Sequence, residues 1–251
     1  MRRRQVLIGV GAAVAVGGLA GSLRDESETT NLEGDAPTLA AAGSPETICA
    51  AEPEVDPGIY AIDEPAFGTD WKGHAVGDRY ANDGRMGENW TVIGIERDGD
   101  ARAYPVPVLW YHEIVNDEFG GPVLITYCQI CRSGLVARRQ VDGSPTRFEV
   151  SGQLWEPPRE YTSASVARDR VRGVAERGGE SVRIFNSGNL VLLDRTTGSF
   201  WSQLLARAIC GPASGDRLSI VPTTIATWGE WRTEHPGGEV LLPPPHSGTV
   251  E

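Results

Sequence analysis

Residues 123–131 read VLITYCQIC, an uninterrupted apolar run that leads into two cysteines spaced three residues apart. A short run of β-branched and aromatic residues predicts a buried strand. Cys128 and Cys131 therefore lie where that strand gives way to a turn. A pair with this spacing can hold a metal ion, cycle between dithiol and disulfide, or form a structural disulfide.

Strand patterns on both sides of this stretch flank turn signals, as expected of β-hairpins. Because strands and helices never alternate regularly, a doubly wound parallel sheet is not expected. We expect an α+β, β-rich fold: a single domain of several antiparallel hairpins with a few short helices. The hairpins pair residues 92–96 with 101–104, 135–141 with 147–150, and 190–193 with 199–201.

Two short helices are expected. Thr227 and Glu230 have capping-box spacing, which predicts a helix that ends near residue 234. The first helix begins at Pro107 and is stopped by residues 119–122, and its inward face carries Val108, His112 and Val115.

Composition divides the rest of the chain. Residues 1–21 combine three arginines with a Gly/Ala-rich apolar run, which indicates a twin-arginine-type signal or signal anchor. Residues 22–57 form an acidic, flexible tether, and the globular domain covers 58–241, with 156–184 as an exposed insertion. Residues 242–251 are expected to be a disordered tail. This organisation places the protein outside the cytoplasm, secreted or tethered to the outer face of the cell membrane.

The formal net charge is −11 at pH 7, and Lys72 is the only lysine. Such a surface repels nucleic acid and anionic lipid, so we expect no nucleic-acid partner and membrane contact only through the N-terminal segment. An acidic, lysine-poor composition also favours adaptation to high salt. No Gly-rich phosphate loop is present, and no organic cofactor is expected. Nothing in the composition identifies a partner or decides whether the protein is an enzyme.

Three chemistries fit the cysteine pair. In the first, His112, which lies 16 residues before Cys128, joins both thiolates to bind copper or zinc, with an unassigned fourth ligand. In the second, Cys128 attacks a partner disulfide and Cys131 resolves the intermediate. In the third, an oxidising compartment closes the pair as a disulfide that braces a non-catalytic binding module. Metal binding by His112, Cys128 and Cys131 is the leading prediction.

Cys49 and Cys210 are the remaining cysteines. A bond between them would attach the tether to the domain, and free thiols are the alternative.

Several sequence blocks, taken in order, resemble the family catalogued as domain of unknown function 3179. The resemblance covers about residues 58–236 and implies an exported or membrane-tethered protein, without implying an activity. It also places His112 and the cysteines in one signature, which favours a shared site. The family pattern near the cysteines is close to C-P-x-C-G, whereas this chain has Gln129 and Arg132, so a non-glycine residue must adopt a tight turn conformation. The blocks are residues 58–65, 111–117, 126–131, 150–152, 193–203, 227–231 and 235–236.

Overall fold

The structure is a computed structural model that describes residues 49–50, 52–53, 58–81, 84–155, 171–177, 180–185 and 189–249. The expected signal at 1–21, most of the expected tether at 22–57 and residues 156–170 of the expected insertion lie outside these residues.

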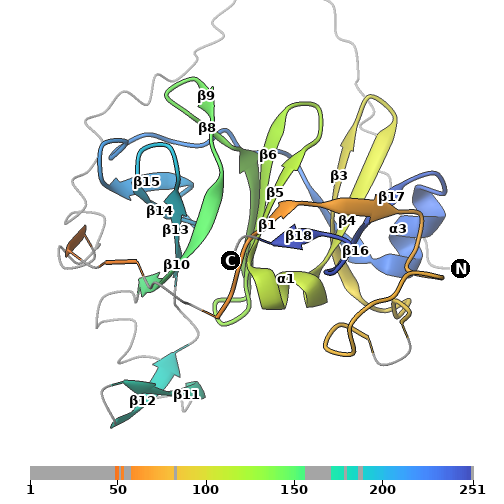
Figure 1. Cartoon of the computed structure of the whole chain (residues 1–251), viewed down its shortest axis with the longest axis horizontal. Coiled ribbons are helices and arrows are strands. Elements are labelled where there is room, and N and C mark those ends of the chain that lie inside the picture. Colours follow the sequence, from red (N-terminus) through yellow and green to blue (C-terminus); the bar gives the residue numbers. More distant parts are fainter. Residues whose placement is uncertain are drawn as a thin grey trace, which may run out of the picture. The chain divides into compact units, whose positions relative to one another are not determined.

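The predicted strand at 123–127 is part of a five-stranded sheet, here called the central sheet (Figure 1). Its β1–β5 pair is parallel and its other pairs are antiparallel. In spatial order its strands are β18 (Gly248–Thr249), β1 (Ile62–Glu64), β5 (Ile114–Glu118), β6 (Pro122–Cys128) and β7 (Ser133–Arg138).

A second five-stranded sheet contains the predicted hairpin around Asp98 and Gly99. Both turn residues have positive φ, 54° and 95°, as a tight two-residue hairpin turn requires. The strand order is β16 (Thr224–Thr227), β3 (Thr91–Arg97), β4 (Asp100–Pro105), β17 (Glu239–Leu242) and β2 (Ala66–Gly68).

A third sheet has four antiparallel strands and contains the predicted hairpin at 190–201. Its strands are β10 (Phe148–Trp155), β13 (Asn189–Asp194), β14 (Phe200–Ser202) and β15 (Arg207–Cys210). Two further hairpins are formed by β8 (Gln140–Val141) with β9 (Ser144–Pro145), and by β11 (Val171–Arg177) with β12 (Glu180–Phe185) inside the expected insertion.

Alternation along β6 explains the uninterrupted apolar run. Val123 and Ile125 belong to a core cluster with residues of the second sheet, such as Ile93. Leu124 and Cys128 belong to another cluster with residues of the third sheet, such as Phe148 and Trp201. The strand is therefore apolar on both faces because each face packs against a different sheet.

The described residues contain two short helices, α1 (Val106–His112) and α3 (Trp228–Glu234), and neither is long and apolar enough to cross a membrane. The capping box of Thr227 and Glu230 is confirmed. The placement of Val115 on the first helix is wrong, because α1 ends where Glu113 adopts a left-handed conformation with φ 55°. Val115 lies in β5, and residues 119–122 connect β5 to β6 instead of ending the helix.

The predicted hairpin at 135–150 forms only in its turn. The β8–β9 pair closes around Asp142 and Gly143, but β7 pairs with β6 while β10 pairs with β13. The chain therefore passes from the central sheet to the third sheet at this turn. The Asn116 side chain fixes the crossing, since its amide donates to the Phe148 carbonyl (2.9 Å) and its carbonyl accepts from the Phe148 amide (2.8 Å).

The expected disordered tail at 242–251 differs from the structure. Leu242 ends β17, and β18 pairs with β1 through Thr249 and Ile62. Ser247 is buried, and its hydroxyl accepts a hydrogen bond from the Ala66 amide at 2.9 Å. These contacts extend the folded domain to residue 249, which composition alone did not reveal.

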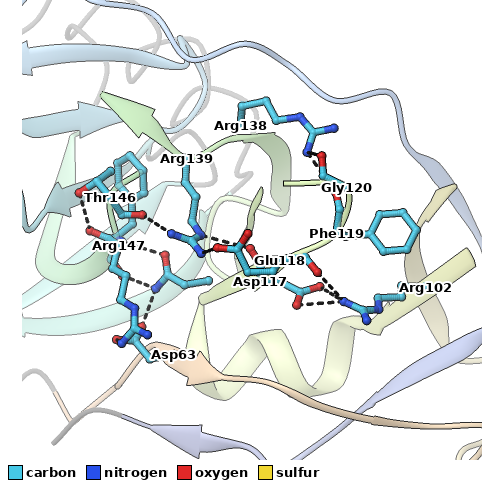
Figure 2. Close-up of polar contacts among 12 residues, drawn as sticks. Asp63, Arg102, Asp117, Glu118, Phe119, Gly120, Arg138, Arg139, Thr146 and Arg147 are labelled. Carbon is cyan, nitrogen blue, oxygen red and sulfur yellow. Dashed lines mark hydrogen bonds and ion pairs between the residues drawn. The ribbon is translucent and has the colours of Figure 1, made fainter. Parts of the chain in front are cut away.

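The end of β5 carries buried polar groups that join the sheets (Figure 2). Asp117 accepts from Arg102 Nη1 (2.9 and 3.1 Å) and from the Tyr104 hydroxyl (2.6 Å). Arg102 also pairs with Glu239 at 2.9 Å and lies 4.1 Å from the centre of the Phe67 ring. A cavity of about 480 Å³ lies beside this network. Because the charge of Arg102 is already balanced by acidic partners, we interpret this network as one that stabilises the fold.

Candidate functional site

Cys128 and Cys131 form a disulfide where β6 enters its turn. The two sulfurs differ in accessibility, because Cys128 is fully buried while Cys131 is half-buried and Gln129 and Ile130 between them are exposed. The Cys131 amide donates to Cys128 Sγ at 3.0 Å. Such a bond favours a thiolate at Cys128 once the disulfide is opened.

Gln203 holds the two strands that carry this turn. Its Nε2 donates to Thr126 Oγ1 (3.1 Å), and its Oε1 accepts from the Ser133 hydroxyl (2.8 Å). Thr126 lies two residues before Cys128, and Ser133 lies opposite Cys128 in the β6–β7 ladder. Gln203 belongs to one of the signature blocks, but its place beside the disulfide depends on a contact 77 residues away in sequence.

Arg132 adopts the left-handed conformation with φ 53°. This confirms the expectation that a non-glycine residue occupies a tight conformation after the cysteines. Such a conformation costs a non-glycine residue about 1–3 kcal/mol and is concentrated at functional sites.

His112 makes hydrogen bonds that do not involve the cysteines. Its Nδ1 lies 2.8 Å from the Tyr60 carbonyl, which can only accept, so Nδ1 carries the proton. Its Nε2 lies 2.7 Å from the Tyr80 hydroxyl and accepts from it. Burial lowers the pKa of His112, which keeps the ring neutral.

The predicted metal site therefore finds no support. Both cysteines are bonded to each other, and both nitrogens of His112 have partners. Within the described part of the chain, no group of three or more His, Cys, Asp or Glu side chains is arranged to hold a metal ion.

Glu113 is a buried acid that sequence reasoning passed over. Only 8% of the residue is exposed, and its side chain has no hydrogen-bond or ion-pair partner among the described residues. Burial raises the pKa of the Glu113 carboxyl from 4.5 to about 7. The backbone carbonyl of Glu113 accepts a hydrogen bond from the Tyr127 amide at 2.8 Å. Glu113 therefore lies opposite the residue that precedes Cys128. Only its place in the 111–117 block had distinguished it in the sequence.

An apolar cavity of about 400 Å³ opens beside the disulfide turn. Among the described residues that line it, Arg132 is the only charged one, and Gly134 and Leu135 of β7 form part of its wall. Trp110 of α1, Ile93 of β3 and Ile225 of β16 are among the residues that line it from other elements.

Cys49 and Cys210 form the second disulfide, which confirms the pairing considered from the sequence. It joins a residue of the expected tether to the end of β15, with 161 residues between them. All four cysteines of the chain are therefore paired.

The comparison with known families agrees with the resemblance of the sequence blocks. No curated protein and no solved structure matches the chain. The family described as "Protein of unknown function (DUF3179)" matches residues 56–158 and 162–249, which include the disulfide turn, Glu113 and Gln203. The chain therefore belongs to this family of proteins of unknown function.

Proposed function

We propose that the domain exchanges disulfides with partner proteins through Cys128 and Cys131. The observation that carries the proposal is the asymmetry of the pair, with a half-buried Cys131 at an exposed turn and a buried Cys128 that accepts an amide hydrogen bond. Thiolate attack on a disulfide requires an accessible sulfur and a stabilised leaving thiolate, and here the Cys131 amide supplies that stabilisation.

The exchange proceeds in two displacements. A partner thiolate attacks Cys131 Sγ, the Cys128–Cys131 bond breaks, and Cys128 Sγ leaves as a thiolate that the Cys131 amide stabilises. A second partner thiolate then attacks the partner's own sulfur in the mixed disulfide and releases the Cys131 thiolate. The partner dithiol loses two electrons and becomes a disulfide, and the cysteine pair gains them and takes up two protons from water. The reverse sequence reduces a partner disulfide.

This assignment gives Cys131 the reactive role that sequence reasoning had given to Cys128. Burial supports the change, because Cys128 is fully buried and Cys131 is half-buried. We also propose that the protein acts outside the cytoplasm. The arginine-containing N-terminal segment and the pairing of all four cysteines support that location, since disulfides persist in oxidising compartments.

A redox titration tests the proposal. The full chain is equilibrated in glutathione buffers of graded potential, quenched with a maleimide and analysed by peptide mass, with the Cys49–Cys210 disulfide as the internal reference. We expect Cys128 and Cys131 to be reduced together at roughly −180 to −300 mV, the range of biological thiol buffers. A pair that stays oxidised throughout is a structural disulfide, and that result would refute the proposal.

Single substitutions test the asymmetry. Cys128→Ser leaves the half-buried sulfur free and should trap mixed disulfides, whereas Cys131→Ser leaves only a buried thiol and should trap few. Equal trapping by both variants would contradict the assigned roles. The reduced protein offers two thiolates, so its copper and zinc content should be measured in parallel. One equivalent of metal that requires both cysteines would replace redox exchange with metal binding.

A further inference from the structure

Exposed apolar side chains surround the cavity beside the disulfide. Trp110, Ile220 and Ile225 line it and are 42%, 57% and 73% exposed. They come from α1, from the loop between β15 and β16, and from β16, so separate segments place apolar groups on one cavity. Clustered exposed apolar groups mark a binding surface, unlike the single exposed apolar residues found on any protein.

The cavity borders the turn that carries the proposed reactive sulfur, and neither cysteine lines it. Arg132 lines the cavity and directly follows Cys131, and Gly134 and Leu135 line it as the chain leaves the turn. A molecule whose cysteine reaches Cys131 therefore brings its neighbouring groups to the cavity opening.

The neighbouring sheet edge favours an extended polypeptide as the occupant. β16 is the end strand of the second sheet, and its backbone pairs only with β3 among the described residues. An exposed edge of this kind can pair with an added extended strand. Ile225 lies on this edge and also lines the cavity.

We infer that the cavity receives an apolar side chain adjacent to the reacting cysteine of an extended polypeptide substrate. The inference rests on the proposed disulfide exchange and specifies its substrate class. The cavity of about 400 Å³ falls within the usual size range of binding pockets, roughly 300–1,000 Å³. Its lining suits a large aliphatic or aromatic group, with Arg132 available to a backbone carbonyl or a carboxylate of the substrate.

The test uses the full chain with Cys128→Ser, in which Cys131 is a free thiol. Synthetic peptides carry one cysteine capped as a mixed disulfide with a chromogenic thiol, and attack by Cys131 on the peptide sulfur releases the chromogen. One peptide has Leu and Phe beside the cysteine, a second has Ser and Gly, and capped glutathione is the small reference. We expect the apolar peptide to react about tenfold or more faster than the polar peptide, from burial of one apolar side chain.

Two substitutions locate the effect. Ile225→Ser should remove most of the preference for the apolar peptide, whereas Leu204→Ser changes another exposed apolar residue, outside the cavity lining, and should retain it. The readout is the ratio of the two peptide rates, and Leu204→Ser should also leave the rate with capped glutathione unchanged.

Different failures are distinguishable. A Cys131 that does not react even with capped glutathione refutes the exchange function itself. Normal reaction with glutathione but equal rates for the two peptides overturns only the substrate inference. A dimer detected by sedimentation that Ile225→Ser dissociates would also overturn it, because a second copy of the chain would then cover the cavity.

Discussion

Replacing Glu113 by glutamine tests whether the acid at the end of α1 is held protonated by the fold. The residue is 8% exposed, and burial alone raises the pKa of its carboxyl from 4.5 to about 7. At about 1.4 kcal/mol per pKa unit, this difference means that ionised Glu113 costs the folded state about 3 kcal/mol. Glutamine has nearly the same shape and no charge, so it removes this cost.

The sign of the effect follows from proton binding. Between pH 4.5 and about 7 the folded protein holds a proton on Glu113 that the unfolded chain has lost, so rising pH lowers the free energy of unfolding. Below pH 4.5 both states are protonated and Glu113→Gln should be nearly neutral. Above pH 7 the variant should be more stable than the wild type by about 3 kcal/mol.

Urea unfolding of the oxidised proteins at several pH values between 4 and 8.5 measures this difference. Glu234→Gln makes the same chemical change at an exposed position of α3 and is the matched control. The reasoning is refuted if the difference between Glu113→Gln and the wild type is constant with pH, or if it decreases as pH rises.

Two further substitutions probe the packing and the second disulfide. A Cβ at Gly94 would lie 2.1 Å from the nearest atom of the Trp231 ring, so Gly94→Ala should lower the free energy of unfolding by about 1–3 kcal/mol. Gly237 has open space around it, so Gly237→Ala should change the free energy of unfolding little. Chemical denaturation measures both variants. Replacing Cys49 and Cys210 by serine removes a bond that spans 161 residues and should lower the free energy of unfolding by about 2–5 kcal/mol in the same measurement; an unchanged free energy would contradict this.

Local sequence patterns predicted the features that local physics determines. The Asp98-Gly99 hairpin, the capping box of Thr227 and the buried strand before Cys128 each depend on residues close together in sequence, and all three are confirmed. The end of α1 was missed because Glu113 takes the left-handed position that glycine usually marks. As a result, β5 was read as a continuation of the helix.

The candidate site was predictable only in part. The spacing of Cys128 and Cys131 identified the pair in the sequence. To choose among its three possible chemistries, one must know how buried each sulfur is, and only the structure shows this. The bracing by Gln203 and the two partners of His112 are long-range contacts that no local pattern encodes. Glu113 needed the structure because burial, not sequence, raises the pKa of its carboxyl.

The strand order has a consequence for how the protein is made. β17 lies between β4 and β2, and β18 pairs with β1, so segments near residue 240 complete sheets begun by residues 62–105. A nascent chain emerging from the ribosome cannot complete either sheet until these last strands have been synthesised. Pairing across such large sequence separations also slows folding. The domain should therefore reach its final form only once residues up to 249 have been synthesised, and the Cys49–Cys210 disulfide, which spans 161 residues, should form late.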